Sequence, residues 1–398
     1  MQVVFVVIDA LPNQWVTPEW TPNLWELVTE GGWNSRGGKA VLSTATYPNH
    51  ASFVTGREPA SHGIFVNRVW DGSKFIISSK VGPKGDTIFK SARRSGISTA
   101  VVVGDHNLIG VMGAGDADAC WPPDGARADV ALDEFRYAAD SSVLDAVETI
   151  DLVGTDLGFV HFNEPDTVCH LFGPDAEETK ERIRGTDTAF GDLVERYKPS
   201  WDDTVLIVVS DHDQEHVVEY GFDLADALDQ RSLPGIVENE GTCAVVFDGP
   251  DTETLMTFDE LEGAKVLDAQ HTLVWGKSGH VFGPWLDDLH GSHGSPRTST
   301  QVAVVGGGPA GAVGLCLAEA AAAPLDCGGR GSGRRGGAAL LDALWLGVPG
   351  HHPSSRGDAA HGALLRGAPA RAAQPPRRLP LWPHGRGEDG HRPRPRAV

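Results

Sequence analysis

The chain has 398 residues, 40% of them hydrophobic and 22% charged, which is enough for one large domain or for a core with an inserted cap. Its formal net charge of −21 argues against non-specific binding of a nucleic-acid polymer, which needs a basic face, but it does not exclude a small phosphate compound held by bound cations. No apolar stretch is long enough to span a bilayer, so we expect no membrane segment.

The cysteines are odd in number and widely spaced, which favours reduced, structural thiols over a disulfide framework. They are Cys120, Cys169, Cys243, Cys316 and Cys327. An apolar run begins almost at Met1 and leaves no room for a signal peptide, so we expect a cytoplasmic protein, or a secreted one if a leader is missing. Nothing in the composition indicates the oligomeric state.

The first predicted element is a buried strand over Val3–Ile8, a continuous apolar run. Thr21 and Pro22 then predict the start of a helix that Gly31 ends. Later elements alternate along the chain, with helices predicted over 86–95, 141–150 and 176–197 and strands over 99–103, 157–162 and 204–209. This alternation predicts an α/β sandwich with a central, largely parallel sheet flanked by helices.

Residues 213–290 have weaker periodicity, and we expect them to form the remaining sheet edge and a small cap that shapes substrate choice. The run from Val302 to Gly306, continued to Gly311, matches a strand followed by the G-x-G-x-x-G dinucleotide fingerprint. No βαβ unit follows to hold a cofactor, so an ordinary closing strand is the favoured interpretation. The catalytic domain is therefore expected to span residues 1–306.

Residues 307–398 differ sharply in composition from the rest of the chain. They lack Lys, Ile, Phe, Tyr, Asn, Thr and Met, and carry twelve arginines against six acidic residues. Such a bias predicts a poorly ordered tail. One hypothesis is that the tail is translated out of the ancestral reading frame; a closing helix over 338–347 is the alternative for part of it.

Acidic and imidazole side chains follow three of the predicted strands. Asp9 ends the first strand, Asp166 and His170 follow the strand over 157–162, and Asp211 and His212 follow the strand over 204–209. Ligands of parallel sheets gather at the carboxyl ends of the strands, so these side chains should meet at one edge. Carboxylates and imidazoles together suit a hydrolytic zinc site.

The motifs containing these residues resemble the alkaline phosphatase superfamily, most closely its type I phosphodiesterase / nucleotide pyrophosphatase branch. The resemblance rests on their order from the first strand to just beyond His293. The motifs are Val-Ile-Asp9, Thr46-Tyr-Pro-Asn-His-Ala-Ser-Phe-Val-Thr-Gly, Ser-His-Gly-Ile64, Glu-Pro-Asp166, Ser-Asp211-His212 and His293-Gly.

The resemblance implies a role for each matching residue. Thr46, with Thr44 a neighbour that could be confused with it, is the implied nucleophile. Asn67 is the implied donor to a non-bridging phosphate oxygen. The implied metal ligands are Asp9, Asp211, His212 and the Thr46 oxygen for one zinc ion, and Asp166, His170 and His293 for the other. His50, His62 and His106 are expected to be structural or to support the ligands.

The implied function is a metal-dependent hydrolase that cleaves phosphodiester or pyrophosphate bonds of nucleotide-type substrates through a phospho-threonine intermediate. Alternatives are a phosphonoacetate-type carbon–phosphorus hydrolase, or a phosphomonoesterase, for which Arg68 is a nearby cation. An inactive metal-binding pseudoenzyme or a damaged product is the alternative of another class. Manganese or iron can replace zinc at such ligands.

Two positions depart from the family pattern. Cys169 stands where the family often has glycine, and Asp213 stands where Asp-His-Gly is usual. Either side chain could crowd the metal or add a ligand beside it, so both put the substrate in doubt more than the activity.

Overall fold

The computed structural model describes residues 1–123, 126–284 and 288–308. The predictions made for the tail, including its disorder, its reading frame and a helix over 338–347, therefore lie outside the described residues, apart from Gly307 and Gly308. The three cysteines within the described ranges, Cys120, Cys169 and Cys243, are all free thiols.

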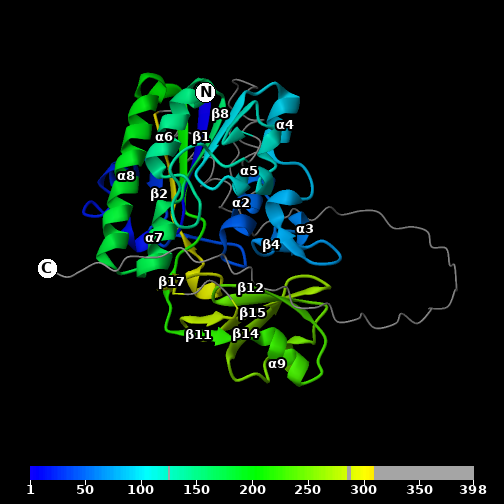
Figure 1. Cartoon of the computed structure of the whole chain (residues 1–398). Coiled ribbons are helices and arrows are strands. Elements are labelled where there is room, and N and C mark those ends of the chain that lie inside the picture. Colours follow the sequence, from blue (N-terminus) through cyan, green and yellow to red (C-terminus); the bar gives the residue numbers. More distant parts are fainter. Residues whose placement is uncertain (124–125, 285–287, 309–398) are drawn as a thin grey trace, which may run out of the picture. The chain divides into compact units, whose positions relative to one another are not determined.

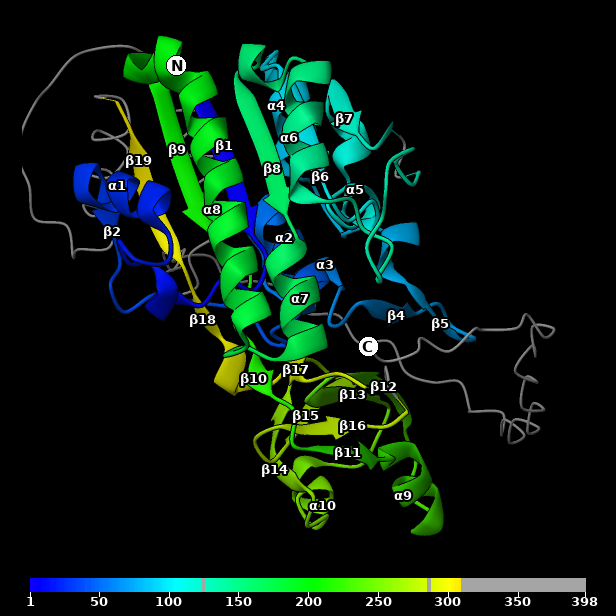
Figure 2. The same cartoon turned by 60° about the vertical axis from the view of Figure 1, so that its left-hand side comes forward.

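A seven-stranded sheet with the order β2-β19-β9-β1-β8-β6-β7 forms the centre of the fold (Figures 1 and 2). The strands from β9 to β7 run parallel, and only β19 and β2 run antiparallel to their neighbours. The predicted largely parallel sheet is confirmed. Its strands are β1 (Gln2–Ile8), β2 (Gly32–Trp33), β6 (Thr99–Val103), β7 (Ala119–Trp121), β8 (Leu157–Phe162), β9 (Thr204–Val209) and β19 (Ala303–Gly307).

Helices cover both faces of this sheet because β1 is apolar on both sides. Val4 and Val6 pack in a core cluster with α1 (Pro22–Glu30), α6 (Asp140–Thr149) and α8 (Glu177–Tyr197). Val3 and Val7 point to the other face. There they pack with α2 (Thr46–Thr55), α4 (Ile88–Ser95) and α5 (Asn107–Val111).

The predicted helices form with boundaries that shift by at most two residues. The helix predicted over 86–95 begins at Ile88, because Thr87 Oγ1 accepts a hydrogen bond from the Lys90 amide and caps it. Gly96, in the left-handed region, ends it. The sequence did not predict the helices α2, α3 (Pro59–His62), α5 and α7 (Glu164–Phe172).

Residues 213–290 form a separate small sheet rather than an edge of the main one. Its strands are β12 (Ile236–Glu240), β13 (Cys243–Phe247), β14 (Leu261–Val266) and β15 (His271–Gly276), accompanied by α9 (Leu224–Gln230). Within the described ranges, no strand of this region joins the seven-stranded sheet, so the expected sheet edge here is wrong. Phe65 and Val66 pack against this sheet at Val245, which ties it to the segment after α3.

Short elements complete the described chain. They are β3 (Gly38–Lys39), β4 (Arg68–Trp70), β5 (Phe75–Ile77), β10 (Glu215–His216), β11 (Glu219–Phe222), α10 (Thr252–Leu255), β16 (His280–Phe282), β17 (Gly291–Ser292) and β18 (Thr300–Gln301). The predicted strand over 302–306 is β19, which pairs with β9 on one side and with the short edge strand β2 on the other.

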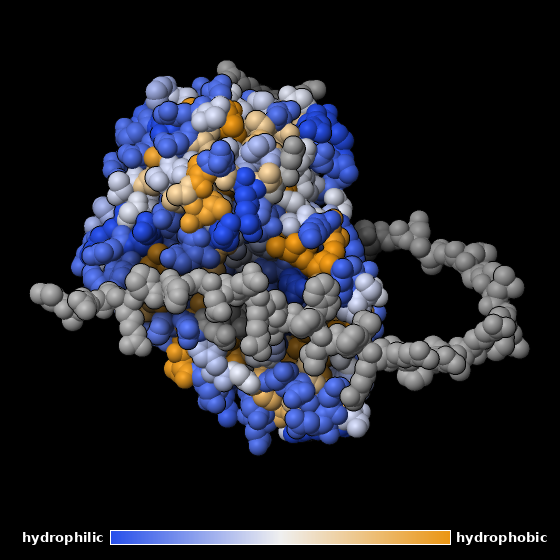
Figure 3. Space-filling model, in the orientation of Figure 1, coloured by the Kyte–Doolittle hydropathy of each residue, from blue (hydrophilic) through white to orange (hydrophobic). Residues whose placement is uncertain are grey.

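The exposed apolar residues are dispersed. Among them are Val81, Phe172, Val218 and Val266, which belong to different parts of the chain. On the face in Figure 3, apolar patches are interrupted by hydrophilic residues. Of the helices that the structure describes, none has both the length and the apolar character needed to cross a bilayer.

Candidate metal centre

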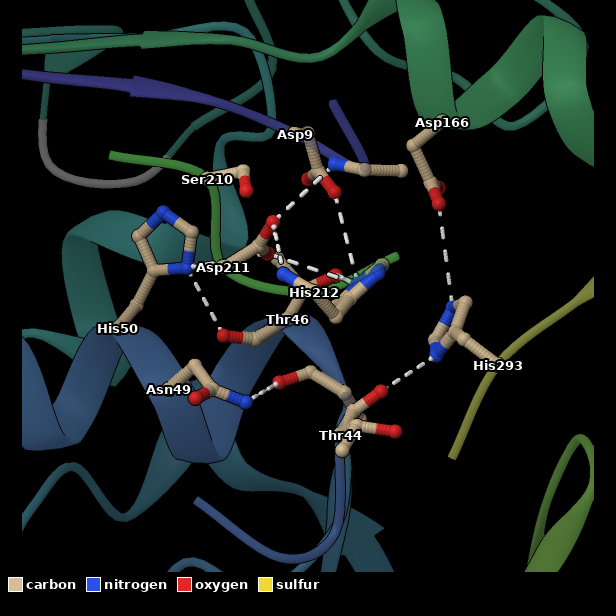
Figure 4. Close-up of polar contacts among 12 residues, drawn as sticks. Asp9, Thr44, Thr46, Asn49, His50, Asp166, Ser210, Asp211, His212 and His293 are labelled. Carbon is tan, nitrogen blue, oxygen red and sulfur yellow. Dashed lines mark hydrogen bonds and ion pairs between the residues drawn. The ribbon is translucent and has the colours of Figure 1, made fainter. Parts of the chain in front are cut away.

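Three of the expected ligands follow two neighbouring strands of the main sheet (Figure 4). Asp9 comes directly after β1, and Asp211 and His212 follow β9. These strands pair in parallel with Val7 opposite Val209, so their carboxyl ends lie together. All three side chains are buried.

Thr46 is the first residue of α2 and lies against this group. Its Oγ1 is 3.2 Å from His212 Nε2. The amino end of a helix carries unpaired N–H groups and a partial positive charge, which favour an anion there. His50, one turn further along α2, holds the Thr46 carbonyl oxygen at 2.8 Å through Nδ1. The proposed nucleophile therefore sits at a favourable position for developing negative charge.

Asp9, Asp211 and His212 each offer a ligand atom, and these atoms lie within 4.8 Å of one another. His212 Nε2 is 3.5 Å from Asp9 Oδ1 and 3.5 Å from Asp211 Oδ2. Both of these buried carboxylate oxygens lack a hydrogen-bond partner. Burial, and then the charge of Asp211, raise the pKa of Asp9 well above its ordinary value. A cation between the groups would remove this repulsion.

A second compact group contains Asp166, His293 and again His212. His293 Nε2 is 3.9 Å from Asp166 Oδ1, and the His212 and His293 rings stack with centroids 3.9 Å apart. His170 lies one helical turn after Asp166 on α7, with Nε2 3.5 Å from Asp166 Oδ1. The structure thus brings His170 beside this group, but it places His212 between the two groups, which the sequence did not predict.

The three histidines share one orientation that suits metal binding. The Nδ1 atoms of His170, His212 and His293 lie 2.8, 3.2 and 3.0 Å from the carbonyl oxygens of Gly291, Asp213 and Thr44. A carbonyl can only accept, so each Nδ1 carries the hydrogen and each Nε2 offers a lone pair. Burial and the two other imidazoles lower the pKa of His293 well below its ordinary value, which keeps it neutral as a ligand must be.

The donor set therefore fits divalent metal ions. Carboxylate oxygens and imidazole lone pairs converge in a buried space with unpartnered acceptor atoms, an arrangement that is unfavourable until a cation neutralises it. Zinc, manganese and iron all accept such ligands.

Asn67 contacts the residue that follows Thr46. Its Oδ1 accepts a hydrogen bond from the Tyr47 amide at 3.2 Å, and its Nδ2 donates to Glu240 Oε1 at 2.9 Å. The neighbouring Arg68 forms an ion pair with Glu238 at 3.2 Å. The cation considered for a monoester clamp is thus already paired with a carboxylate.

Several supporting residues were not found from the sequence. His161 Nε2 is 2.9 Å from Asp9 Oδ2, and Gln214 Nε2 donates to Asp166 Oδ1 at 2.6 Å. His161 interrupts the apolar strand β8, and a lone imidazole in such a strand is a usable signal. Gln214 and Glu240 follow no comparable sequence pattern, so their roles could be identified only from the three-dimensional structure.

The two departures from the family pattern add no ligand to either group. Asp213 Oδ1 accepts a hydrogen bond from the Gln214 amide at 2.7 Å, so this carboxylate is engaged within its own turn. Burial, and then Asp166, raise the pKa of the Cys169 thiol well above its ordinary value, which keeps it a neutral thiol.

The fold has close structural relatives. It resembles murine ectonucleotide pyrophosphatase / phosphodiesterase 5, with a TM-score of 0.59 and 20% identity over 78% of this chain and 88% of that chain. It also resembles phosphonoacetate hydrolase from Sinorhizobium meliloti 1021, with a TM-score of 0.58 and 17% identity over 77% and 89% of the two chains. At these levels of sequence identity, both comparisons show a similarity of fold alone.

Curated proteins are similar over shorter stretches. An uncharacterized pyrophosphatase/phosphodiesterase of Schizosaccharomyces pombe is 28% identical over 224 residues, which are 53% of this chain and 44% of the relative. The human bis(5'-adenosyl)-triphosphatase is 26% identical over 185 residues, 44% of this chain and 39% of the relative. The chain thus spans less than half the length of these two relatives.

The family model for type I phosphodiesterase / nucleotide pyrophosphatase matches residues 3–290, which include both ligand groups except His293. The match to the family model, the fold and the grouped carboxylates and imidazoles all point to the same family. The chain belongs to the type I phosphodiesterase / nucleotide pyrophosphatase family.

Proposed function

We propose that the protein hydrolyses phosphodiester or pyrophosphate bonds in nucleotide-type substrates through a phospho-threonine intermediate at Thr46. The observation that carries this proposal is the position of Thr46 Oγ1, which lies 3.2 Å from His212 Nε2. His212 is the side chain common to both ligand groups.

Asp9, Asp211, His212 and the Thr46 oxygen would hold one zinc ion, and Asp166, His170 and His293 would hold the other. When bound, such ions withdraw charge from phosphoryl oxygens and lower the pKa of the Thr46 hydroxyl. Thr46 Oγ1 gives up its proton to water and forms a bond to phosphorus, while the leaving oxygen departs with its electron pair and takes up a proton from water. Water cleaves the threonine ester in a second step and restores the hydroxyl. The amino end of α2 and the Asn67 amide favour the charge that develops at the phosphoryl group.

The nucleotide class is supported by relatives. A solved structure of the murine neighbour is an inactive variant in complex with AMP, and the human relative is named a bis(5'-adenosyl)-triphosphatase. A dianionic monoester fits less well, because Arg68 is paired with Glu238 and a further buried carboxyl group, Glu240, contacts Asn67. We also propose that residues 1–306 form the catalytic domain, with residues 213–290 as a specificity region.

The test is hydrolysis of bis-p-nitrophenyl phosphate, compared with the monoester, by chelator-stripped protein before and after zinc is restored. Thr46→Ala should lower kcat/KM by on the order of 10⁴-fold or more, because the nucleophile is lost. Thr55→Ala, at the other end of α2, is the matched control, since its Oγ1 donates to the Ala51 carbonyl oxygen and contacts no ligand group. Turnover of phosphonoacetate instead of the diester would favour the carbon–phosphorus hydrolase, and unchanged turnover in Thr46→Ala would contradict the proposed mechanism.

A further inference from the structure

Glu240 is a buried carboxyl group outside both ligand groups. It is the last residue of β12 and is only 1% exposed. Both of its oxygens accept hydrogen bonds from one residue, since the Asn67 amide N–H donates to Oε2 at 2.7 Å and Asn67 Nδ2 donates to Oε1 at 2.9 Å. Burial raises the pKa of Glu240 to about 8, against the opposing effect of the hydrogen bond from the Asn67 backbone, so the carboxylate and its stronger, charge-assisted hydrogen bonds prevail above that pH.

The Oδ1 atom of Asn67 is held by α2, the helix that begins with Thr46. Asn67 Oδ1 accepts a hydrogen bond from the backbone N–H of Tyr47, the residue after Thr46. Glu240 requires a donor on one side of the amide, and Tyr47 requires an acceptor on the other. Only one of the two flipped orientations of Asn67 satisfies both partners. Because an amide nitrogen carries two hydrogens, one N–H remains for a ligand.

Glu238 provides an internal comparison on the same strand. It lies two residues before Glu240 and therefore on the same side of β12. Its partner is the Arg68 guanidinium, whose side chain is 52% exposed, so solvent screens this ion pair although Glu238 itself is buried. Only Glu240 is connected, through Asn67, to the turn that carries Thr46.

We propose that Glu240 is a positioning residue, which holds the Asn67 amide so that its free N–H faces the phosphoryl group attacked by Thr46. The small sheet thereby contributes to catalysis without supplying a metal ligand. This inference rests on the proposed function, because it needs a phosphoryl group next to Thr46. Glu240→Gln should disrupt the arrangement, since a glutamine offers one acceptor where Asn67 presents two donors.

A double-mutant cycle on kcat/KM for the diester tests this inference. We expect Glu240→Gln to lower kcat/KM by about 10- to 100-fold, as loss of a supporting hydrogen bond does. Asn67→Ala should lower it by on the order of 10²-fold, because a donor to the transition state is lost. The double variant should be no slower than Asn67→Ala alone, and Glu238→Gln should remain close to wild type. Metal content and Tm of each variant establish that fold and metal centre persist.

The cycle separates this inference from the proposed function. An equal loss from Glu240→Gln in the presence and absence of Asn67 would show that Glu240 does not act through Asn67 and would overturn the inference, as would wild-type activity of Glu240→Gln. If Glu240→Gln does not fold, Glu240→Asp enters the same cycle, since it keeps the carboxyl group but is too short to reach both donors. Absence of diester turnover in the wild type would instead refute the proposed function, and the inference with it.

Discussion

The two halves of the candidate metal centre are built in different ways. The strand-end group (Asp9, Asp211 and His212) sits on neighbouring strands whose register is set by backbone hydrogen bonds. The helix group (Asp166, His170 and His293) combines α7 with the segment after β17, and the isolated bridge between Thr44 and Gly294 helps to hold that segment. The first group is thus a direct product of the sheet, whereas the second depends on contacts between distant loops and helices.

Among changes to the ligand groups, one of the largest effects should come from removing charge in the strand-end group. Asp211→Asn keeps the Oδ1 acceptor used by the Ala10 and His212 amides at 3.2 and 3.0 Å but loses the carboxylate charge. Loss of several kcal/mol of charge stabilisation predicts a decrease in kcat/KM of about 10³-fold. Asp213→Asn is the matched control, because its carboxylate lies outside both groups. It should lower kcat/KM much less. Similar losses of kcat/KM in both variants would contradict the assignment of Asp211, and not Asp213, to the strand-end group.

The ligands of the helix group should contribute unequally to kcat/KM, and two histidine variants test this. His293 belongs to the compact group with Asp166 and His212, whereas His170 lies beside that group, with Nε2 3.5 Å from Asp166 Oδ1 and its ring 5.0 Å from that of His293. We expect His293→Ala to lower kcat/KM by about 10³-fold and His170→Ala by about 10- to 100-fold. Equal losses would instead support the symmetrical ligand set implied by the family resemblance. The measurement is steady-state diester hydrolysis at saturating zinc.

A smaller effect, on zinc affinity, should come from changing His161, which lies behind the strand-end group. His161 Nε2 lies 2.9 Å from Asp9 Oδ2 and orients this carboxylate. His161→Gln should weaken zinc affinity by about 10-fold or more, because a partner that orients a ligand is lost. His62→Gln is the matched control, since His62 is equally buried but contacts Ser52 rather than a ligand. Zinc titration with a competing chelator measures both, and equal affinities would exclude the role assigned to His161.

The smallest effect on activity, but a clear one on stability, concerns His62 itself. Its Nδ1 accepts a hydrogen bond from the Ile64 amide, so the ring is neutral, and burial followed by the charge of Arg57 lowers its pKa to about 4. Since the unfolded value is near 6.5, the contribution to stability is complete above pH 6.5 and is lost as the pH falls towards 4. This loss is on the order of 3 kcal/mol.

Denaturant unfolding of the metal-free protein between pH 4 and 7 measures this contribution. Wild-type stability should fall with decreasing pH, and His62→Gln should flatten that part of the curve. Parallel curves for the two proteins would show that His62 does not titrate on unfolding in this range.

Much of the sheet and its ligand positions could be predicted from the sequence. Val3–Ile8 and Val205–Val209 are uninterrupted apolar runs, and the polar residues that follow them mark the carboxyl edge. The helices that carry Thr46 and Asp166 could not be predicted, because α2 is buried on nearly all sides and lacks a polar face with helical period. The position of His212 between the two groups and the contact of Glu240 with Asn67 are long-range features without a local pattern.

The metal content of three proteins tests the central claim most directly. Zinc-loaded wild type, Asp211→Asn and Asp166→Asn would be freed of excess metal and measured by elemental analysis against protein concentration. Two separate metal positions predict two ions per chain in the wild type and about one in each variant. A wild type that retains no zinc, or variants that both retain two ions, would contradict a centre built from these two groups.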